Sequence, residues 1–321
     1  MFILSFIGLT AVSQQPYKRG MQLMGSTFEI TVVDDDAIRA NNHIDAAVTE
    51  IKRIERLISS WDMASQTSEI NKNAGVKAIR VKKELFQLIE RAKSISKLTD
   101  GAFDISYASM DRIWKFDKSM EQMPSDKEIK LSVAKVGAKN IELDAKNNTI
   151  FLNKKGMKIG FGAIGKGYAA DKAKTLLQER GVSAGIINAS GDMNAWGSQP
   201  DGTPWRVAIR NPMNKNKVFA LMPLQNKAVV TSGNYEKYVR FNGVRYTHII
   251  DPRTGYPATE LISVTVFAPK AELADALATA VFVMGKEAGI DRINQIPNVD
   301  CILIDHKGII STSENIELNN I

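Results

Sequence analysis

A glycine-rich stretch with a single lysine is the first candidate for chemistry. Residues 159–171 read IGFGAIGKGYAAD, with four glycines around Lys166. Glycines beside the start of a helix let backbone N–H groups approach a ligand, and the helix dipole favours negative charge there. A phosphate or pyrophosphate is the ligand that such a loop favours. GKGY lacks the Ser or Thr of a Walker A loop, and GFGAIG lacks the acidic partner of a dinucleotide fingerprint. The alternative is a tight strand-to-helix turn.

A carboxylate and a hydroxyl in ELADALATA suggest a metal ion. Asp275 and Thr279 are four residues apart, so on a helix their oxygens project from one face. The helix is otherwise almost wholly apolar, which predicts burial, and a buried carboxylate needs a partner. A hard cation such as Mg²⁺, which commonly bridges phosphate oxygens, would supply one. The alternative is the polar face of a surface helix.

Two further residues have types suited to ligand contact. His248 lies in RYTHIIDPRTGYP, beside a turn formed by Asp251, Pro252 and Gly255, and suits proton transfer or phosphate contact. A structural histidine is the alternative. Trp61, in ISSWDMASQTSEINKN, has the shape to stack on a flat ring, or to fill the core.

Length and composition indicate an ordinary globular protein. The 321 residues form either one elaborate domain or two intimate subdomains. The net charge is +7, but lysines and acids interleave, which predicts a solvated surface. A nucleic-acid groove needs clustered basic residues, and the sequence has no such block. An anionic ligand or partner remains compatible with this charge.

The N-terminal residues and the single cysteine indicate the cellular compartment of the protein. Residues 1–13, MFILSFIGLTAVS, form a short apolar run that ends in small-x-small, which predicts a signal peptide cleaved before Gln14 and a periplasmic protein. The run lacks a basic n-region and is too short to span a bilayer, and a buried first strand is the alternative. Cys301 is the only cysteine, so no intramolecular disulfide forms, and we expect it in a buried strand.

Hydrophobic spacing predicts a mixture of helices and strands. Helices are expected over 42–59, 83–98, 168–180 and within ELADALATAVFVMG, and strands over 26–34 and within TIFLN, GMKIGFG, AGIINAS and LISVTVFAP. YVRFNGVRYTHII predicts a hairpin with Asn242-Gly243 at its tip, and the lysine-rich stretch 117–148 predicts a helical excursion at the surface. Regular βαβ alternation is missing, which favours an α+β fold, and no linker divides residues 14–321.

Together these stretches resemble the ApbE family of FAD:protein FMN transferases. The resemblance covers nearly all of 21–285 and includes MGSTFEITV, TDGAFDIS followed by IWKF, GFGAIGKGYAAD, INASGDM, AIRNP, TSGNYEKY, THIIDPRTG and ADALATAVFVMG. It implies a single mixed α/β domain of the ApbE type, similar to a T-fold.

The resemblance also implies roles for individual residues. The implied FAD contacts are Met24, Trp61, Ala102, Phe103, Asp104, Gly160, Lys166 and Ile250. The implied Mg²⁺ ligands are Asp275, Thr279 and the main-chain carbonyls of Ala163 and Ala278, and the implied catalytic groups are His248 and Asp275.

Two positions depart from the family pattern. Many relatives have Asp where this chain has Gly160, which leaves that FAD contact to Asp104 or Asp192. Ser190 stands where glycine is usual, and we expect it to be tolerated if its φ is negative.

The chemistry implied by the resemblance is a Mg²⁺-dependent transfer of FMN from FAD to a Ser or Thr hydroxyl of an acceptor flavoprotein, with release of AMP. The expected acceptor is a subunit of a membrane electron-transfer complex. If water attacks instead, the protein is an FAD pyrophosphatase. The non-enzymatic alternative is a periplasmic flavin-binding protein.

Overall fold

The structure is a computed structural model that describes residues 13–117, 119–210, 218–233 and 238–316. The expected signal segment therefore lies outside the described residues except for Ser13. Parts of the motifs AIRNP and TSGNYEKY also lie outside them.

One large antiparallel sheet organises the fold. Its eight strands follow the order β1-β2-β6-β7-β10-β13-β14-β15, and every neighbouring pair is antiparallel. The strands are β1 (Gln15–Leu23), β2 (Ser26–Asp34), β6 (Gly185–Ala189), β7 (Asp192–Trp196), β10 (Ala228–Gly233), β13 (Leu261–Ala268), β14 (Asp300–Asp305) and β15 (Ile310–Thr312). This topology confirms the predicted α+β class, because a doubly wound fold requires parallel strands.

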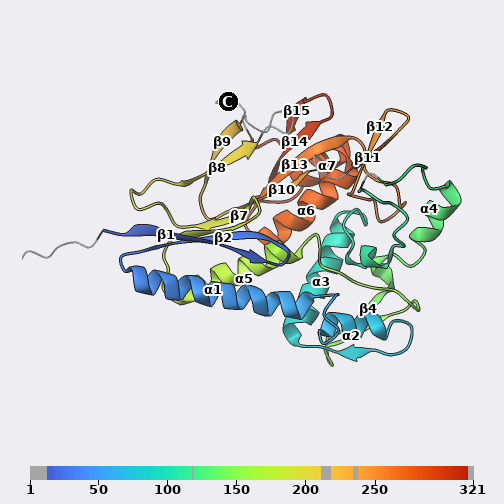
Figure 1. Cartoon of the computed structure of the whole chain (residues 1–321), viewed down its shortest axis with the longest axis horizontal. Coiled ribbons are helices and arrows are strands. Elements are labelled where there is room, and N and C mark those ends of the chain that lie inside the picture. Colours follow the sequence, from blue (N-terminus) through green and yellow to red (C-terminus); the bar gives the residue numbers. More distant parts are fainter. Residues whose placement is uncertain (1–12, 118, 211–217, 234–237, 317–321) are drawn as a thin grey trace, which may run out of the picture.

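Helices cover one face of this sheet, and a two-stranded ribbon covers the other. The helices are α1 (Ala37–Ile58), α5 (Gly165–Glu179), α6 (Ala271–Met284) and α7 (Lys286–Asn294), and Figure 1 shows α1, α5 and α6 along the sheet. The ribbon pairs β8 (Trp205–Arg210) with β9 (Val218–Leu224). Strand alternation explains the two layers, because Val230 packs with the helices while Val229 packs with the ribbon.

A smaller part of the chain packs beside the helices. It contains α2 (Gln66–Lys72), α3 (Lys83–Leu98), the short helix η1 (Ile105–Ser109), α4 (Asp126–Ser132), the short helix η2 (Ala138–Asn140) and a three-stranded sheet of β3 (Ile79–Arg80), β5 (Thr149–Leu152) and β4 (Ile141–Asp144). The lysine-rich stretch thus holds the predicted helix, α4, and also strand β4. Many of the apolar residues of this part join the core of the large sheet.

Several predicted elements have the expected bounds. The helix over 83–98 and the strand over 26–34 coincide with α3 and β2. The predicted hairpin is β11 (Tyr238–Phe241) and β12 (Val244–Thr247), and both tip residues have positive φ. Cys301 is buried in β14, as expected.

Three element predictions need correction. Helix α1 begins at Ala37, not at 42, because the Asp36 side chain accepts the Arg39 N–H at 2.6 Å and caps the helix earlier. Helix α5 begins at Gly165, not at 168. The stretch GMKIGFG is not a strand, because its backbone bonds to side chains of Asn71 and Ser109 instead of a neighbouring strand.

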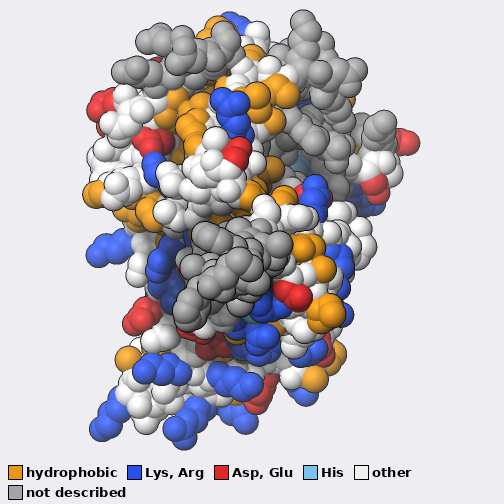
Figure 2. Space-filling model, turned by 90° about the vertical axis from the view of Figure 1, so that its left-hand side faces the viewer, with side chains coloured by type: hydrophobic (Ala, Val, Ile, Leu, Met, Phe, Trp, Pro, Cys, Tyr) orange, Lys and Arg blue, Asp and Glu red, His pale blue; other side chains and the backbone are white. Residues whose placement is uncertain are grey.

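The surface charge is dispersed over the face shown in Figure 2. Basic side chains spread over the lower part of this face with acidic ones among them, and hydrophobic side chains gather in its upper part. Exposed ion pairs such as Arg19 with Asp45 and Lys18 with Glu29 fit the solvated surface expected from the sequence. In the part of the chain that the structure describes, no helix combines the length and apolar character needed to cross a membrane.

Candidate active site

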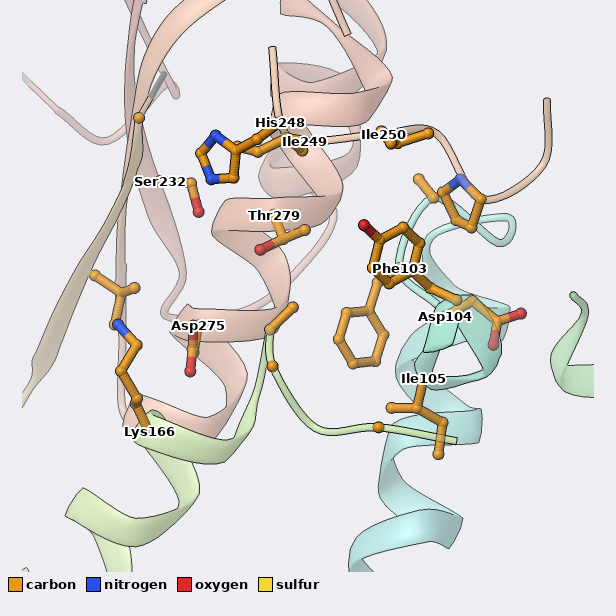
Figure 3. A pocket seen from close by; sticks show the side chains of 18 of the residues that line it. Phe103, Asp104, Ile105, Lys166, Ser232, His248, Ile249, Ile250, Asp275 and Thr279 are labelled. Atoms are coloured by element: carbon orange, nitrogen blue, oxygen red, sulfur yellow. The ribbon is translucent and has the colours of Figure 1, made fainter. Parts of the chain in front are cut away.

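A cavity of about 390 Å³ lies where α5, α6, β10 and the loops around residues 103 and 249 meet. This volume is within the usual range for small-molecule sites. Its lining residues are Ala102, Phe103, Asp104, Ile105, Tyr107, Gly160, Gly162, Ala163, Lys166, Asp192, Val230, Thr231, Ser232, Gly233, His248, Ile249, Ile250, Pro252, Asp275 and Thr279. Figure 3 shows a polar wall with Lys166, Asp275, Thr279, Ser232 and His248 facing a wall that carries Phe103 and Ile105.

Helices α5 and α6 carry the polar wall. Lys166, in the first turn of α5, forms an ion pair with Asp192 at the start of β7. The other oxygen of Asp192 accepts the Thr231 N–H at 3.1 Å. On α6, Asp275 Oδ2 accepts the N–H of Gly167 at 3.1 Å. The polar groups are therefore held by contacts among several elements.

The charges of this wall do not balance. One ammonium group, Lys166, faces two carboxylates, Asp192 and Asp275, that are 7% and 5% exposed. Burial raises the pKa of Asp275, with a further rise from Asp192, against the lowering effect of Lys166. Although burial opposes it, the two carboxylates raise the pKa of Lys166. The cluster thus holds a surplus negative charge, which a bound cation would neutralise.

The four glycines of the loop divide into two pairs. Gly160 and Gly162 line the cavity. Gly165 and Gly167 lie inside α5, where a Cβ atom would come within 2.8 Å of Ile58 Cδ1 and 2.2 Å of the Ala271 carbonyl oxygen, respectively. The loop therefore lines the cavity with one pair and packs closely against α1 and α6 with the other, which confirms the structural interpretation of its sequence and leaves phosphate binding as a prediction.

The opposite wall is mainly apolar. Phe103 and Ile105 are buried and face the cavity. The Asp104 carboxylate points away from it and accepts the backbone N–H groups of Ser106 and Ala138 at 2.8 and 2.6 Å. Asp104 therefore lines the cavity with its backbone and serves as a cap, and its side chain does not replace the contact missing at Gly160.

His248 and Ser232 close the polar wall. Both side chains reach into the cavity in Figure 3, His248 from the segment after β12 and Ser232 from β10. Ile250, on the same segment as His248, lies on the side of Phe103 in Figure 3, where it is buried and paired with Pro257 through an isolated bridge. Sequence reasoning missed Ser232 as an individual residue, although the motif TSGNYEKY that contains it is part of the resemblance.

Ten of the predicted site residues line one cavity. They are Ala102, Phe103, Asp104, Gly160, Ala163, Lys166, His248, Ile250, Asp275 and Thr279. Ala278 is fully buried within α6 and does not line it. Met24 lies in the turn between β1 and β2, and its side chain packs near Gly165 of α5.

Trp61 and Ser190 depart from expectation. Trp61 is 77% exposed, with the Arg112 guanidinium 5.2 Å from its ring centroid, so the core alternative is wrong. It does not line the cavity. Ser190 has a φ of +57°, so the condition under which we expected it to be tolerated, a negative φ, is not met. The tight turn with Gly191 requires the left-handed conformation, and Ser190 Oγ donates to the Thr27 carbonyl there.

The side chains of the cavity limit the kind of metal site that it can form. Among the described residues, no group of three or more His, Cys, Asp or Glu side chains is arranged to hold a metal ion. A metal ion here would therefore rely on Asp275 with neutral oxygens from Thr279 and the loop backbone. Such a set suits Mg²⁺, which keeps several waters or phosphate oxygens and needs few protein carboxylates. The surplus negative charge of the cluster also fits a cation.

The class of protein is defined by an antiparallel α+β fold with a cavity whose polar wall includes residues of α5 and α6. The chain belongs to the ApbE family, whose profile matches residues 24–303. It is 30% identical to the FAD:protein FMN transferase of Klebsiella pneumoniae over 290 residues, 90% of this chain and 89% of that protein. It is also 30% identical to the FAD:protein FMN transferase of Treponema pallidum over 304 residues, 90% of this chain and 84% of that protein.

Solved structures have the same fold. The ApbE protein of Thermotoga maritima superposes with a TM-score of 0.84 at 33% identity, covering 94% of this chain and 97% of that one. The flavin transferase ApbE of Vibrio cholerae superposes with a TM-score of 0.82 at 25% identity, covering 94% and 98%. These likenesses confirm the fold expected from the resemblance.

Proposed function

We propose that the protein is a Mg²⁺-dependent FAD:protein FMN transferase. The observation that carries the proposal is the cluster of half-buried Lys166 with buried Asp192 and Asp275 at the N-terminal end of α5, on one wall of a cavity with an apolar opposite wall. Such a site offers charge to a pyrophosphate and apolar surface to a flat ring. The family relationship adds the identity of the substrate.

In the proposed reaction, an acceptor Ser or Thr oxygen attacks the phosphorus on the FMN side of the FAD pyrophosphate. A new P–O bond to the acceptor forms, the bond to the bridging oxygen breaks, and AMP leaves with that oxygen. The acceptor hydroxyl loses its proton to a base. Lys166 and the backbone of the glycine loop would bind the phosphate oxygens and orient them for the attack.

The residues of the site fit a Mg²⁺ ion. Asp275 and Thr279, with the Ala163 carbonyl at the loop, would hold it, and Gly167 fixes the carboxylate of Asp275 through its N–H. When bound, Mg²⁺ supplies positive charge that stabilises the pyrophosphate as the P–O bond breaks. Without it, the two carboxylates would repel the anionic substrate.

His248 is the proposed general base. Its ring projects into the cavity from the segment after β12, close to the Ser232 hydroxyl in Figure 3. An imidazole is suited to take a hydroxyl proton near neutral pH. We expect His248→Asn to lower the rate of transfer by about 10²–10⁴-fold with little change in FAD affinity.

The products separate this proposal from its alternatives. Mass spectrometry of an acceptor peptide incubated with FAD and Mg²⁺ would reveal an added FMN phosphoester if transfer occurs. Free FMN and AMP without modified peptide would indicate a pyrophosphatase. Unchanged FAD, bound but intact, would indicate a flavin-binding protein.

The metal assignment is tested by two substitutions on α6. Asp275→Asn keeps the shape of the side chain and removes its charge, so Mg²⁺-dependent AMP release should be abolished while FAD still binds. Thr279→Val should give a milder loss, because water can replace a neutral hydroxyl ligand. Metal-dependent AMP release at the wild-type rate in Asp275→Asn would place the metal elsewhere.

The proposed acceptor is a flavoprotein subunit of a membrane electron-transfer complex, and the proposed compartment is the periplasm. Strand β1 begins at Gln15, directly after the predicted cleavage point before Gln14. N-terminal sequencing of the protein from its native cells tests the export proposal. A protein that retains Met1 in the cytoplasmic fraction would contradict it.

A further inference from the structure

A set of polar contacts joins β7, α5 and α6 inside an otherwise apolar interface. Asp192 and Asn194 are two residues apart on β7, so their side chains leave the same face of the strand. Asp192 pairs with Lys166, and Asn194, which is fully buried, donates to Asp171 Oδ1 at 2.7 Å. The site described above is therefore one end of a longer polar connection.

Asp171 caps a helix to which it does not belong. Lys270, the residue at the N-cap of α6, makes no side-chain capping bond. Instead Asp171, from α5, accepts the Ala271 N–H on Oδ1 and the Glu272 N–H on Oδ2, both at 2.9 Å. A carboxylate at this end also complements the helix dipole. The start of α6 is therefore fixed to the middle of α5.

The capped residue shares a helix face with the proposed metal ligands. Ala271, Asp275 and Thr279 follow one another at intervals of four residues, so they lie on successive turns of one face of α6. Ala271 is also the point at which α6 touches Gly167 most closely. Any rotation or shift of α6 at Ala271 would move the oxygens of Asp275 and Thr279.

Asp171 is itself held in place. Lys174, one turn further along α5, donates to Asn194 Oδ1 at 3.0 Å and to the Ala195 carbonyl at 3.1 Å. Asn194 thereby presents its amide group to Asp171 in one orientation. The carboxylate is thus bonded to two α6 N–H groups and one β7 amide, a set that specifies its position.

We propose that Asp171 is a positioning residue for the active site. By capping α6 from α5, it sets where Asp275 and Thr279 stand relative to Lys166 and the glycine loop. This inference rests on the proposed function, since it concerns the metal and the phosphate that these residues would share. Outer residues that orient metal ligands typically change metal affinity about 10–100-fold when they are replaced.

The test compares Asp171→Ala with Glu260→Ala in the full chain. Glu260 makes a similar contact elsewhere, because its carboxylate accepts the Lys286 N–H at the start of α7 at 3.1 Å, and it lies outside the site. Both variants should lose thermal stability. Only Asp171→Ala should raise, by roughly tenfold or more, the Mg²⁺ concentration for half-maximal AMP release. We expect its KM for FAD to stay close to that of the wild type.

A second readout does not depend on turnover. Mg²⁺ should raise the Tm of the wild type and of Glu260→Ala, and Asp171→Ala should need a higher Mg²⁺ concentration for the same rise. If Asp171→Ala does not fold, Asp171→Asn serves instead, because it keeps the shape but turns an N–H group of its amide toward one of the two donors.

The outcomes are distinguishable. A wild type that forms neither modified acceptor nor AMP contradicts the proposed function. A wild type whose activity and Tm ignore Mg²⁺ contradicts the metal assignment and this inference with it. An active, Mg²⁺-responsive wild type whose Asp171 variants respond to Mg²⁺ as Glu260→Ala does overturns the positioning role alone.

Discussion

At the scale of single residues, Lys166 pairs with Asp192 and also faces the cavity where a ligand would bind. In the structure its ammonium group pairs with Asp192, a carboxylate that is only 7% exposed. The glycine-rich sequence around it indicates a lysine that faces a ligand and contributes little to stability. The ion pair changes that expectation, because removal of Lys166 leaves a buried carboxylate without its counter-charge.

We therefore expect Lys166→Ala to lower both FAD affinity and stability. The lost contact to pyrophosphate should weaken FAD binding by about 1.5–3 kcal/mol. The unpaired Asp192 should lower the free energy of unfolding by about 1–3 kcal/mol. Fluorescence titration with FAD and urea unfolding measure the two effects separately.

The double variant Lys166→Ala with Asp192→Asn provides the control. It removes the unpaired charge, so stability should recover toward wild type while FAD affinity stays low. A single variant that is as stable as wild type would contradict the structural part of this prediction. If Lys166→Ala binds FAD with wild-type affinity, the role of Lys166 is purely structural.

Some of these site residues could be predicted from the sequence, and others could not. Lys166, Asp275 and Thr279 could be predicted because each stands out from its own element, as a lone charge in a glycine run or as polar groups on an apolar helix. Asp192 could not be paired with Lys166, since the two are joined only by the packing of β7 on α5. The cap formed by the Asp104 side chain could not be predicted, because a capping carboxylate and a ligand contact look alike in a polar loop.

At the scale of elements, the close approach of α5 to α6 requires a glycine, Gly167, at their contact. A Cβ atom on Gly167 would lie 2.2 Å from the Ala271 carbonyl oxygen and 2.5 Å from its carbon. Both are backbone atoms, so they cannot move aside as a flexible side chain can. The helices would have to separate at the place where Asp171 and Asp275 bind across them.

We expect Gly167→Ala to lower the free energy of unfolding by about 1–3 kcal/mol, as for other overpacked sites. Gly162→Ala is the matched control in the same loop, because a Cβ atom added to Gly162 would have no neighbour within 4 Å. Its stability should stay within about 0.5 kcal/mol of wild type. Urea unfolding of the two variants checks the difference, and equal stability would contradict the close contact.

Two elements show why sequence periodicity does not predict their bounds correctly. Periodicity starts α5 at residue 168 because glycine is a poor helix former, yet Gly165 and Gly167 are helical, and at Gly167 the backbone of α6 leaves room only for glycine. The stretch around Ile159 has the apolar pattern of a strand, but Asn71 and Ser109 take its hydrogen bonds. Residues distant in the chain decide both cases.

At the scale of the whole molecule, a charged network ties three helices together. Glu84 on α3 accepts hydrogen bonds from Arg53 on α1, at 2.7 and 2.9 Å, and from the Tyr168 hydroxyl on α5, at 2.9 Å. The hydrogen bonds from Arg53 lower the pKa of Glu84 to about 2, with help from Tyr168 and against the opposing effect of burial. This network lies outside the cavity lining.

The lowered pKa predicts a defined loss of stability in acid. The Glu84 carboxylate stabilises the folded state fully above its unfolded pKa, and this contribution is lost as the pH falls from about 4.5 toward 2. After a discount for partial solvent exposure, we expect about 2 kcal/mol. Unfolding by urea at pH 3 to 7 should show a steeper acid loss in wild type than in Glu84→Gln. Parallel curves for the two proteins would contradict the prediction.

The alternation of side chains on β7 has a consequence for folding. Asp192 and Asn194 face the helices, while Met193 and Ala195 face the apolar cluster beneath the β8–β9 ribbon. A slip of one residue in the pairing of β7 would exchange these faces. It would place a carboxylate and an amide among Trp205 and Phe267 without partners, at a cost of several kcal/mol. The polar groups that build the site thereby also disfavour the nearest mispaired sheet, so apolar replacements at both positions would remove this protection against misfolding together with the partner of Lys166.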